Sequence, residues 1–256
     1  MRCLITNDDG IDAPGLRALQ AAMRGRADVV VVAPDAEWSG CGHGAPPSDP
    51  VAVRRVVHPI LGEVHVTDGR PAECVRLALH GLLNPPPEVV LCGINRGGNS
   101  GVDIYYSGTV GAAREGFILG CPALAISQLI RRELPEDWDL VTARAKVVLD
   151  LFFEELGRRR RPFLWNVNLP HLPPGVAPRG IADVPVATAP IHFAYDRARA
   201  QDGAFTYRYC GRYFERPAPP GTDVHYLFGG WVTLSELTTD VTSPQATRAE
   251  RPWSGP

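Results

Sequence analysis

The stretch Ile5-Thr6-Asn7-Asp8-Asp9-Gly10 decides how the N-terminal part of this chain is interpreted. A short apolar run, Cys3-Leu4-Ile5, ends there in two adjacent carboxylates and a glycine. Neighbouring side chains of a continuing strand point to opposite faces, whereas a turn at Gly10, which tolerates positive φ, lets Asp8 and Asp9 face one point. Two carboxylates at a strand end suit a hard cation such as Mg²⁺ or Mn²⁺. The alternative is structural, because aspartate also begins turns and caps helices.

The first half of the chain alternates strand patterns with helical patterns. This alternation predicts a Rossmann-like α/β fold, in which helices flank a mainly parallel sheet. We expect Asp12 to cap the first helix, with Pro14 in its first turn. Buried strands are predicted at residues 2–6, 28–33, 88–93 and 121–127, and further helices at residues 71–83 and 108–120.

The second half of the chain is less regular. Apolar residues at helical spacing predict a helix over residues 138–156, and residues 163–168 form one more predicted core strand. Apolar segments at 205–214 and 224–234 predict strands of a hairpin or extension. We therefore expect a core over residues 1–190, a C-terminal extension used in oligomerisation over 191–246, and a flexible tail over 247–256.

Composition excludes several classes of protein. The chain has 256 residues, of which 45% are hydrophobic and 21% are charged, as in ordinary globular domains. A formal net charge of -2 gives no attraction to nucleic acid or to anionic membranes. We expect neither a secretory signal nor a membrane span, because no apolar run is long enough. The six cysteines are scattered without a C-x-x-C pair, which favours a reducing cytoplasm.

Polar loops follow three of the predicted strands. In doubly wound sheets, ligands bind beyond the carboxyl ends of the strands, so these loops are expected to meet at one site. The loop over residues 34–44 contributes Ser39, and the loop over residues 94–101 contributes Asn95. Their neutral oxygens would complete a cation site begun by Asp8 and Asp9.

The segment Ser107-Gly108-Thr109 begins a predicted helix that is rich in small residues. Free backbone N–H groups and the helix dipole make such a start an anion site. Alternatively, Ser107 only caps the helix and the small residues only allow close packing. A divalent cation beside an anion site describes phosphoryl chemistry. His43 is either a proton donor to a leaving alkoxide or an ordinary loop histidine.

Taken together, these segments resemble a known family. Its motifs match, in order, Thr6-Asn7-Asp8-Asp9-Gly10-Ile11-Asp12-Ala13-Pro14-Gly15-Leu16, Ala33-Pro34-Asp35 with Ser39 and Gly42-His43, Gly69-Arg70-Pro71-Ala72-Glu73-Cys74-Val75, Gly93-Ile94-Asn95-Arg96-Gly97-Gly98-Asn99, and Ser107-Gly108-Thr109-Val110-Gly111-Ala112-Ala113. They resemble the SurE (survival protein E) family of metal-dependent 5′-nucleotidases. The resemblance covers roughly the first half of the chain, with weaker matches at Asn166-Val167-Asn168-Leu169-Pro170 and Thr239-Asp240-Val241-Thr242.

The resemblance implies one divalent metal ion per subunit and hydrolysis of nucleoside 5′-monophosphates, with varied phosphoesters and short polyphosphate also accepted in the family. It also implies a homodimer or homotetramer formed through C-terminal extensions. The resemblance implies that the metal ligands are Asp8, Asp9, Ser39 and Asn95. It implies that the phosphate-binding residues are Asn99, Ser107, Gly108 and Thr109. His43 matches a histidine or asparagine found near the site in the family.

The chain departs from the family pattern mainly around one loop. Trp38 stands where arginine or a polar residue is usual, and Gly44-Ala45-Pro46 replaces a Ser-x-Thr run. Arg70 and Glu73 replace a common threonine and aspartate. The rival hypothesis is therefore a nucleotide-binding or scaffolding homologue that has lost turnover. Whether Asp8 or Asp9 orients the attacking water is left open by the sequence.

Overall fold

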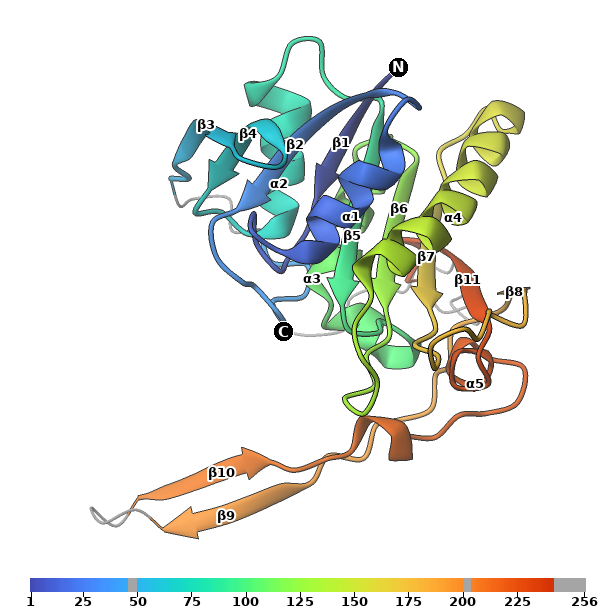
Figure 1. Ribbon diagram of the computed structural model, residues 1–256. Helices are drawn as coiled ribbons and strands as arrows, with labels where there is room; N and C mark the ends of the chain where they lie inside the picture. The colour runs from blue at the N-terminus through green and yellow to red at the C-terminus, as the bar shows by residue number, and fades with distance from the viewer. Residues whose placement is uncertain (46–49, 200–203, 242–256) are drawn as a thin grey trace, which may run out of the picture.

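A nine-stranded sheet forms the centre of the computed structural model, which describes residues 1–45, 50–199 and 204–241 (Figure 1). The strand order is β3-β4-β2-β1-β5-β6-β7-β11-β8. The central strands run parallel: β2 (Asp28–Pro34), β1 (Arg2–Thr6), β5 (Val89–Arg96), β6 (Ala123–Gln128) and β7 (Leu164–Leu169). They are mostly buried, as expected of strands covered on both faces. The predicted Rossmann-like fold is confirmed.

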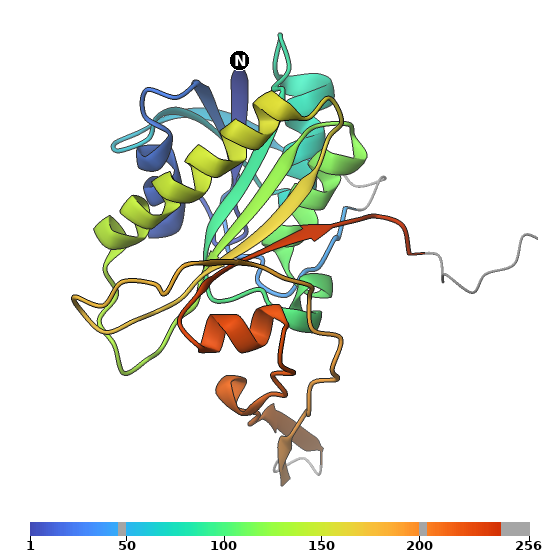
Figure 2. The same ribbon diagram turned by 90° about the vertical axis from the view of Figure 1, so that its right-hand side faces the viewer.

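Helices cover both faces of the sheet (Figures 1 and 2). On one face, α1 (Pro14–Met23) packs beside α4 (Trp138–Arg158), and their apolar sides join one core cluster that includes Leu19 and Phe152. On the other face, α2 (Pro71–Leu77) packs beside α3 (Gly108–Ile118) over a second cluster. The predicted helix over residues 71–83 ends early, because a π-helical turn at Ala78–Leu82 follows α2.

An antiparallel hairpin at one edge of the sheet was not predicted. It consists of β3 (Val53–His58) and β4 (Gly62–Thr67), and β4 pairs with β2 in parallel. In β3 the residues between its first and last are exposed, and they include Arg54 and Arg55. A strand without a buried face shows no alternation of apolar residues, so the sequence does not reveal it. Its charged side chains discourage edge-to-edge pairing between molecules.

The predicted extension over residues 191–246 is wrong in its second part, because residues 224–234 return to the sheet. They form α5 (Asp223–Phe228) and the start of β11 (Val232–Leu237), which pairs antiparallel with β7 and parallel with β8 (Ile181–Asp183). Val224 and Leu227 are almost completely buried against the chain's own core. Their spacing of three residues suits a helix, so the apolar content of this segment serves the core and not a second subunit.

A two-stranded ribbon projects from the body of the molecule (Figure 1). It consists of β9 (Tyr195–Arg199) and β10 (Phe205–Tyr209), paired antiparallel, and every residue of both strands is exposed. The predicted extension is therefore present, but it is shorter than expected. The predicted tail at 247–256 lies outside the described residues. Among the described helices, none combines the length and the apolar character that crossing a bilayer requires.

Candidate active site

The turn after β1 brings the two aspartates to the carboxyl edge of the sheet. Gly10 adopts φ +93°, and the Asn7 side chain closes the turn by donating to the Gly10 carbonyl at 2.8 Å. Neither aspartate caps α1. Its N-cap is Ala13, without a side-chain hydrogen bond, so the predicted cap at Asp12 is wrong. Pro14, the first residue of the helix, has a φ angle already fixed near the helical value, so the helix begins there without a side-chain cap. Asp8 and Asp9 are thus left for other partners.

A pocket of about 260 Å³ lies at this edge. Five of the predicted site residues line it: Asp8, Ser39, Asn95, Asn99 and Ser107. Three others contact residues that line it: Asp9 accepts from the Arg96 backbone N–H at 3.0 Å, and Gly108 and Thr109 lie against Asp8. The loops after β1, β2 and β5 and the start of α3 therefore meet, as the sequence predicted.

Asp8 is the dominant charge of the pocket. Its side chain is only 3% exposed, and its Oδ1 accepts a hydrogen bond from the Thr109 hydroxyl. Burial raises the pKa of Asp8 to about 6, the Thr109 hydrogen bond lowers it, and the neighbouring Asp9 charge raises it again. Within the described residues no lysine or arginine forms an ion pair with Asp8. A buried carboxylate without a counter-charge is costly, so this position favours a bound cation.

Asp9 adds a second, partly screened carboxylate. Burial raises its pKa, the Arg96 N–H lowers it, and the charge of Glu37 raises it. The Arg96 guanidinium lies in an ion pair with Glu136, at 2.5 Å, rather than with Asp9. In the described part of the chain no group of three His, Cys, Asp or Glu side chains could hold a metal. Neutral oxygens from other residue types must therefore complete any cation site here.

Ser39 and Asn95 are placed to supply those oxygens. The Ser39 hydroxyl donates to Glu37 Oε1 at 2.7 Å, which leaves its oxygen lone pairs available. The Asn95 amide nitrogen donates to the Gly97 carbonyl at 2.8 Å, so the amide oxygen is the atom available as a ligand. Two carboxylates and two neutral oxygens form a donor set that fits Mg²⁺ or Mn²⁺.

The start of α3 borders the pocket through backbone rather than side chain. Ser107 is its N-cap, and its hydroxyl accepts from the Val110 N–H at 3.0 Å. A Cβ atom on Gly108 would lie 2.8 Å from the Cβ and Oδ2 atoms of Asp8, so only glycine allows this approach. Close packing also matters further along α3, where a Cβ on Gly116 would lie 2.6 Å from Val90 Cγ2. Ser107 therefore caps α3 and the glycines allow close packing, while the start of the helix still borders the pocket.

The structure does not bring His43 to the pocket. Its Nε2 lies 2.5 Å from Glu115 Oε2, and the other Glu115 oxygen accepts from Arg76 Nε at 2.5 Å. Burial alone would raise the pKa of Glu115, but its hydrogen bonds to His43 and Arg76 outweigh burial and lower it. Because Glu115 lies on α3, this network ties the loop that carries Ser39 to the helix that borders the pocket.

Two asparagines on β7 hold the Asn99 side of the pocket in place. Asn168 Oδ1 accepts from the Asn99 N–H at 2.7 Å, and the amides of Asn166 and Asn168 donate to the Asn99 carbonyl at 2.9 and 3.0 Å. Both are almost completely buried. Two asparagines in a predicted core strand were a usable signal, since buried amides require partners.

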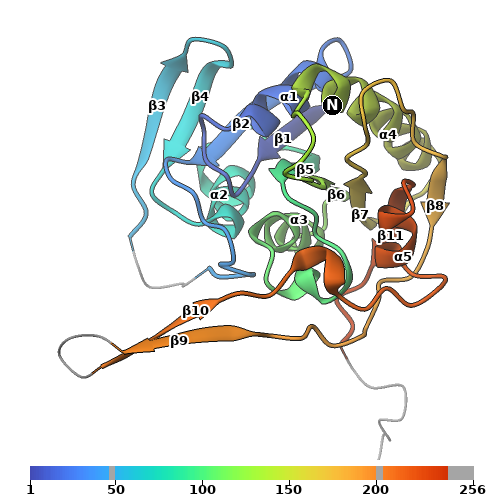
Figure 3. The same cartoon turned by 60° about the horizontal axis from the view of Figure 1, so that its bottom comes forward.

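A C-terminal segment completes the pocket, which the sequence did not predict. Tyr213 lines it, and its hydroxyl lies 3.2 Å from Ser100 Oγ and 3.2 Å from Asp103 Oδ2. Arg216 binds both Asp103 oxygens, at 2.5 and 2.6 Å. Figure 3 brings this edge forward and shows the segment after β10 beside the loop that follows β5. No spacing motif links residues so far apart in the chain.

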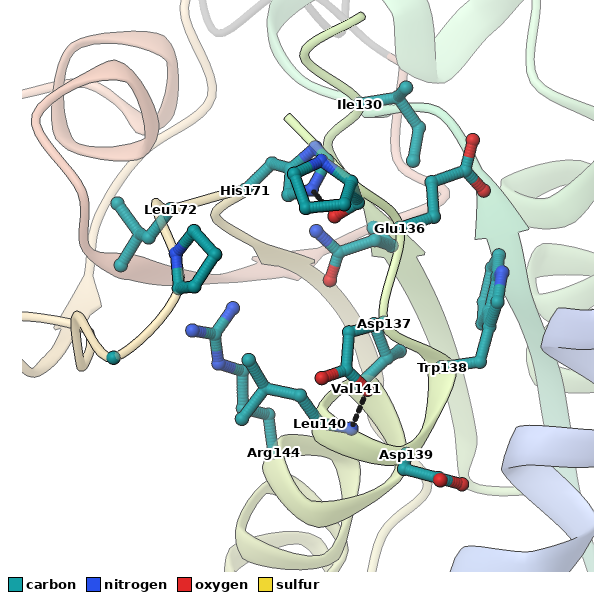
Figure 4. A pocket seen from close by; sticks show the side chains of 14 residues that line it. Ile130, Glu136, Asp137, Trp138, Asp139, Leu140, Val141, Arg144, His171 and Leu172 are labelled. Atoms are coloured by element: carbon teal, nitrogen blue, oxygen red, sulfur yellow. Dashed lines mark hydrogen bonds between the residues drawn. The ribbon is translucent and has the colours of Figure 1, made fainter. Parts of the chain in front are cut away.

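A separate cavity of about 530 Å³ lies where β6 ends and α4 begins (Figure 4). Two of its charged groups are held by structural partners: Asp137 Oδ1 accepts from the Leu140 N–H at 2.9 Å, and Arg144 Nη1 donates to the Pro170 carbonyl at 2.8 Å. Glu136, which lines this cavity, forms the ion pair with Arg96 described above. The cavity therefore borders the aspartate pocket without sharing its carboxylates.

The uncompensated charge on Asp8 predicts an unusual effect on stability. The Asp8 carboxyl group keeps its proton to a higher pH in the folded protein than in the unfolded chain. Ionisation of Asp8 between about pH 4 and pH 6 therefore destabilises the metal-free fold by up to ~3 kcal/mol. In a chelator at pH 8, Asp8→Asn should therefore raise the melting temperature by up to about 6–12 °C. Scanning calorimetry at pH 8 and pH 3.5 tests this expectation. A variant that is destabilised at pH 8, or stabilised equally at both pH values, would contradict it.

Known proteins share this sequence and this fold. The family described as Survival protein SurE matches residues 3–188. A 5′-nucleotidase SurE from Desulforudis audaxviator is 37% identical over 99% of this chain and 97% of its own, and one from Pseudomonas syringae is 37% identical over 99% and 98%. The crystal structure of the SurE protein from Aquifex aeolicus superposes with a TM-score of 0.80 at 32% identity, over 94% of this chain and 95% of that one. The chain belongs to the SurE family.

Proposed function

We propose that this protein is a divalent-metal-dependent phosphatase that hydrolyses nucleoside 5′-monophosphates to nucleoside and inorganic phosphate. One observation carries the proposal: a buried carboxylate without a counter-charge, Asp8, faces a pocket that also meets the start of α3. The names of relatives such as 5′-nucleotidase SurE from Pseudomonas syringae support this substrate class. Phosphoryl transfer depends mainly on positioning and charge stabilisation, which such a pocket is suited to provide.

Asp8, Asp9, Ser39 and Asn95 would hold the metal ion in this proposal. When bound, a divalent ion supplies charge neutralisation for the phosphoryl group and makes a water molecule more acidic. The carboxylate of Asp8 or Asp9 orients the attacking water. The Thr109 hydroxyl fixes one oxygen of Asp8, so the other oxygen keeps a defined direction.

Asn99, Ser107, Gly108 and Thr109 form the phosphate side of the proposed site. The open start of α3 offers backbone N–H groups and the positive end of the helix dipole to the phosphoryl oxygens. Asn99 is positioned by Asn166 and Asn168. We place His43 outside the reacting groups, where its contact with Glu115 supports the Ser39 loop.

A phosphate-release assay tests this function directly. The purified protein should release phosphate from several nucleoside 5′-monophosphates with added Mn²⁺ or Mg²⁺, and release should stop in a chelator. Full activity in the chelator would contradict metal dependence. Nucleotide binding without release under any metal would favour the rival hypothesis, a scaffolding homologue, to which the altered loop around Trp38 and Arg70 would then contribute.

We also propose a homodimer or larger homo-oligomer, with the β9–β10 ribbon as the contact. An isolated two-stranded ribbon is marginally stable in water, and this one exposes Tyr195, Phe205 and Tyr207 at 47–62%. Such a surface is better explained by burial against a second copy. A cytoplasmic location likewise remains a proposal, supported by six free cysteines.

Light scattering at low micromolar concentration tests the oligomer. We expect a mass of at least twice the 27.8 kDa of one chain. Replacing residues 196–208 by a short glycine-serine linker should reduce the mass to that of a monomer. A monomeric parent protein would refute the oligomer, whereas an oligomer that survives the replacement would place the contact elsewhere.

A further inference from the structure

A second cavity, of about 930 Å³, opens beside the aspartate pocket at the root of the β9–β10 ribbon. The two spaces share three lining residues: Asp103, Tyr106 and Tyr213. They are therefore neighbouring compartments that meet at these side chains. A molecule whose phosphate lies in the first compartment would extend past Tyr106 and Tyr213 into the second.

Aromatic rings form much of the wall of this second cavity. Phe193, Tyr209 and Phe214 line it and are 58%, 49% and 39% exposed. The rings of Phe193 and Tyr209 lie 6.0 Å apart between centroids. Large exposed rings gathered around a concave surface mark a binding site for a planar apolar group. Nucleobases are such groups, and aromatic side chains stack on any of them.

The junction between the compartments is held rigidly. Asp103 is fixed by both terminal nitrogens of Arg216 and by the Tyr213 hydroxyl. The Arg216 side chain is 6% exposed, which leaves it little freedom. At the outer wall, Arg132 is exposed and forms no ion pair within the described residues. It is therefore free to donate to acceptor atoms on a base edge.

We infer that the nucleoside of the substrate binds in this second cavity, with the ribose at the Tyr106–Tyr213 junction and the base against the rings of Tyr209, Phe193 and Phe214. This inference rests on the proposed nucleotidase function and identifies the part of the chain that selects nucleotides among phosphoesters. Stacking does not distinguish strongly between bases, so purine and pyrimidine nucleotides should both be accepted.

The test compares AMP with ribose 5-phosphate, which carries the same ester but no base. Tyr209→Ala and Tyr106→Ala should each lower kcat/KM for AMP by about tenfold or more, mainly through KM, because the first loses base stacking and the second loses a contact at the ribose. Tyr209→Ala should leave kcat/KM for ribose 5-phosphate within about twofold. Tyr105→Ala is the matched control: Tyr105 is 64% exposed and adjacent to Tyr106, but it lines a different cavity.

A binding measurement separates failure of this inference from failure of the proposed function. Adenosine should bind the unmodified protein in a calorimeter, with or without a chelator, and Tyr209→Ala should weaken that binding by a similar factor. Equal losses for AMP and ribose 5-phosphate, or no loss for either, would overturn the inference. Adenosine binding without any phosphate release would overturn only the nucleotidase proposal. If adenosine did not bind and Tyr209→Ala had a lower oligomer mass, these rings would instead contact a second copy of the chain. That result would overturn the inference.

Discussion

Replacing Asp9 by asparagine is expected to lower the rate of phosphate release from AMP by about 100-fold or more while the fold stays intact. The substitution preserves shape but removes one anionic ligand from a donor set that otherwise relies on Asp8 and two neutral oxygens. Loss of charge stabilisation at a transferring phosphoryl group costs two to three orders of magnitude in comparable sites, or about 3–4 kcal/mol. The measurement is kcat at saturating Mn²⁺, with circular dichroism as the check on folding.

Asp12→Asn is the matched control for this experiment. Asp12 lies three residues from Asp9, and its side chain is 88% exposed and directed at His58 instead of the pocket. The control should retain activity within about twofold, as is usual for surface substitutions. Full activity in Asp9→Asn, or an equal loss in both variants, would remove Asp9 from the metal site.

Gly108→Ala is expected to lower kcat by about 100-fold, although alanine favours helices. The added methyl group would lie 2.8 Å from the Asp8 Cβ and Oδ2 atoms and 3.0 Å from the Cys41 sulfur. Asp8 is 3% exposed and held by Thr109, so it cannot move away without losing the position in which we propose that it binds the metal. Thr109→Ala removes one hydroxyl and should cost less, about tenfold. Both variants are compared by steady-state kinetics and melting temperature.

The control for the glycine prediction lies in another helix. Gly157 is in α4, and a Cβ atom there meets no neighbouring atom within 4 Å. Gly157→Ala should leave activity unchanged and should slightly stabilise the protein. If Gly108→Ala retained activity, the start of α3 would not border the reacting phosphate. If Gly108→Ala unfolded, the defect would be one of packing, and Thr109→Ala, which adds no atom, would then test whether this helix start acts in catalysis.

The sequence predicted the elements that bury apolar residues and missed those that do not. The parallel core strands read as continuous apolar runs, and α4 repeats its apolar residues at helical spacing, so both were predicted to within a few residues. The exposed strand β3 carries no such pattern. Residues 224–234 were misassigned because their apolar content alone does not distinguish a surface for a partner from a helix and strand returning to the core.

Site residues were predictable where they follow strands in sequence. Asp8 and Ser39 follow parallel strands and Asn95 lies at the end of β5, and parallel strands end at one edge of the sheet. Tyr213, Arg216 and the β7 asparagines reach the same pocket only through tertiary packing. His43 is the opposite case. A short motif predicted it near the site, but in the structure its ring contacts Glu115 and does not line the pocket.

The position of Tyr213, Arg216 and Asp223 late in the chain has a consequence for how the protein is made. Asp223 is completely buried and accepts from the N–H groups of Gly101 and Ala187 at 2.8 Å, so it joins the loop after β5 to the C-terminal segment. A nascent chain still lacking these residues already contains Asp8, Asp9, Ser39 and Asn95, yet it has no closed compartment around them. The pocket is therefore closed only after the segment from Tyr213 to Asp223 has packed against the loop that follows β5.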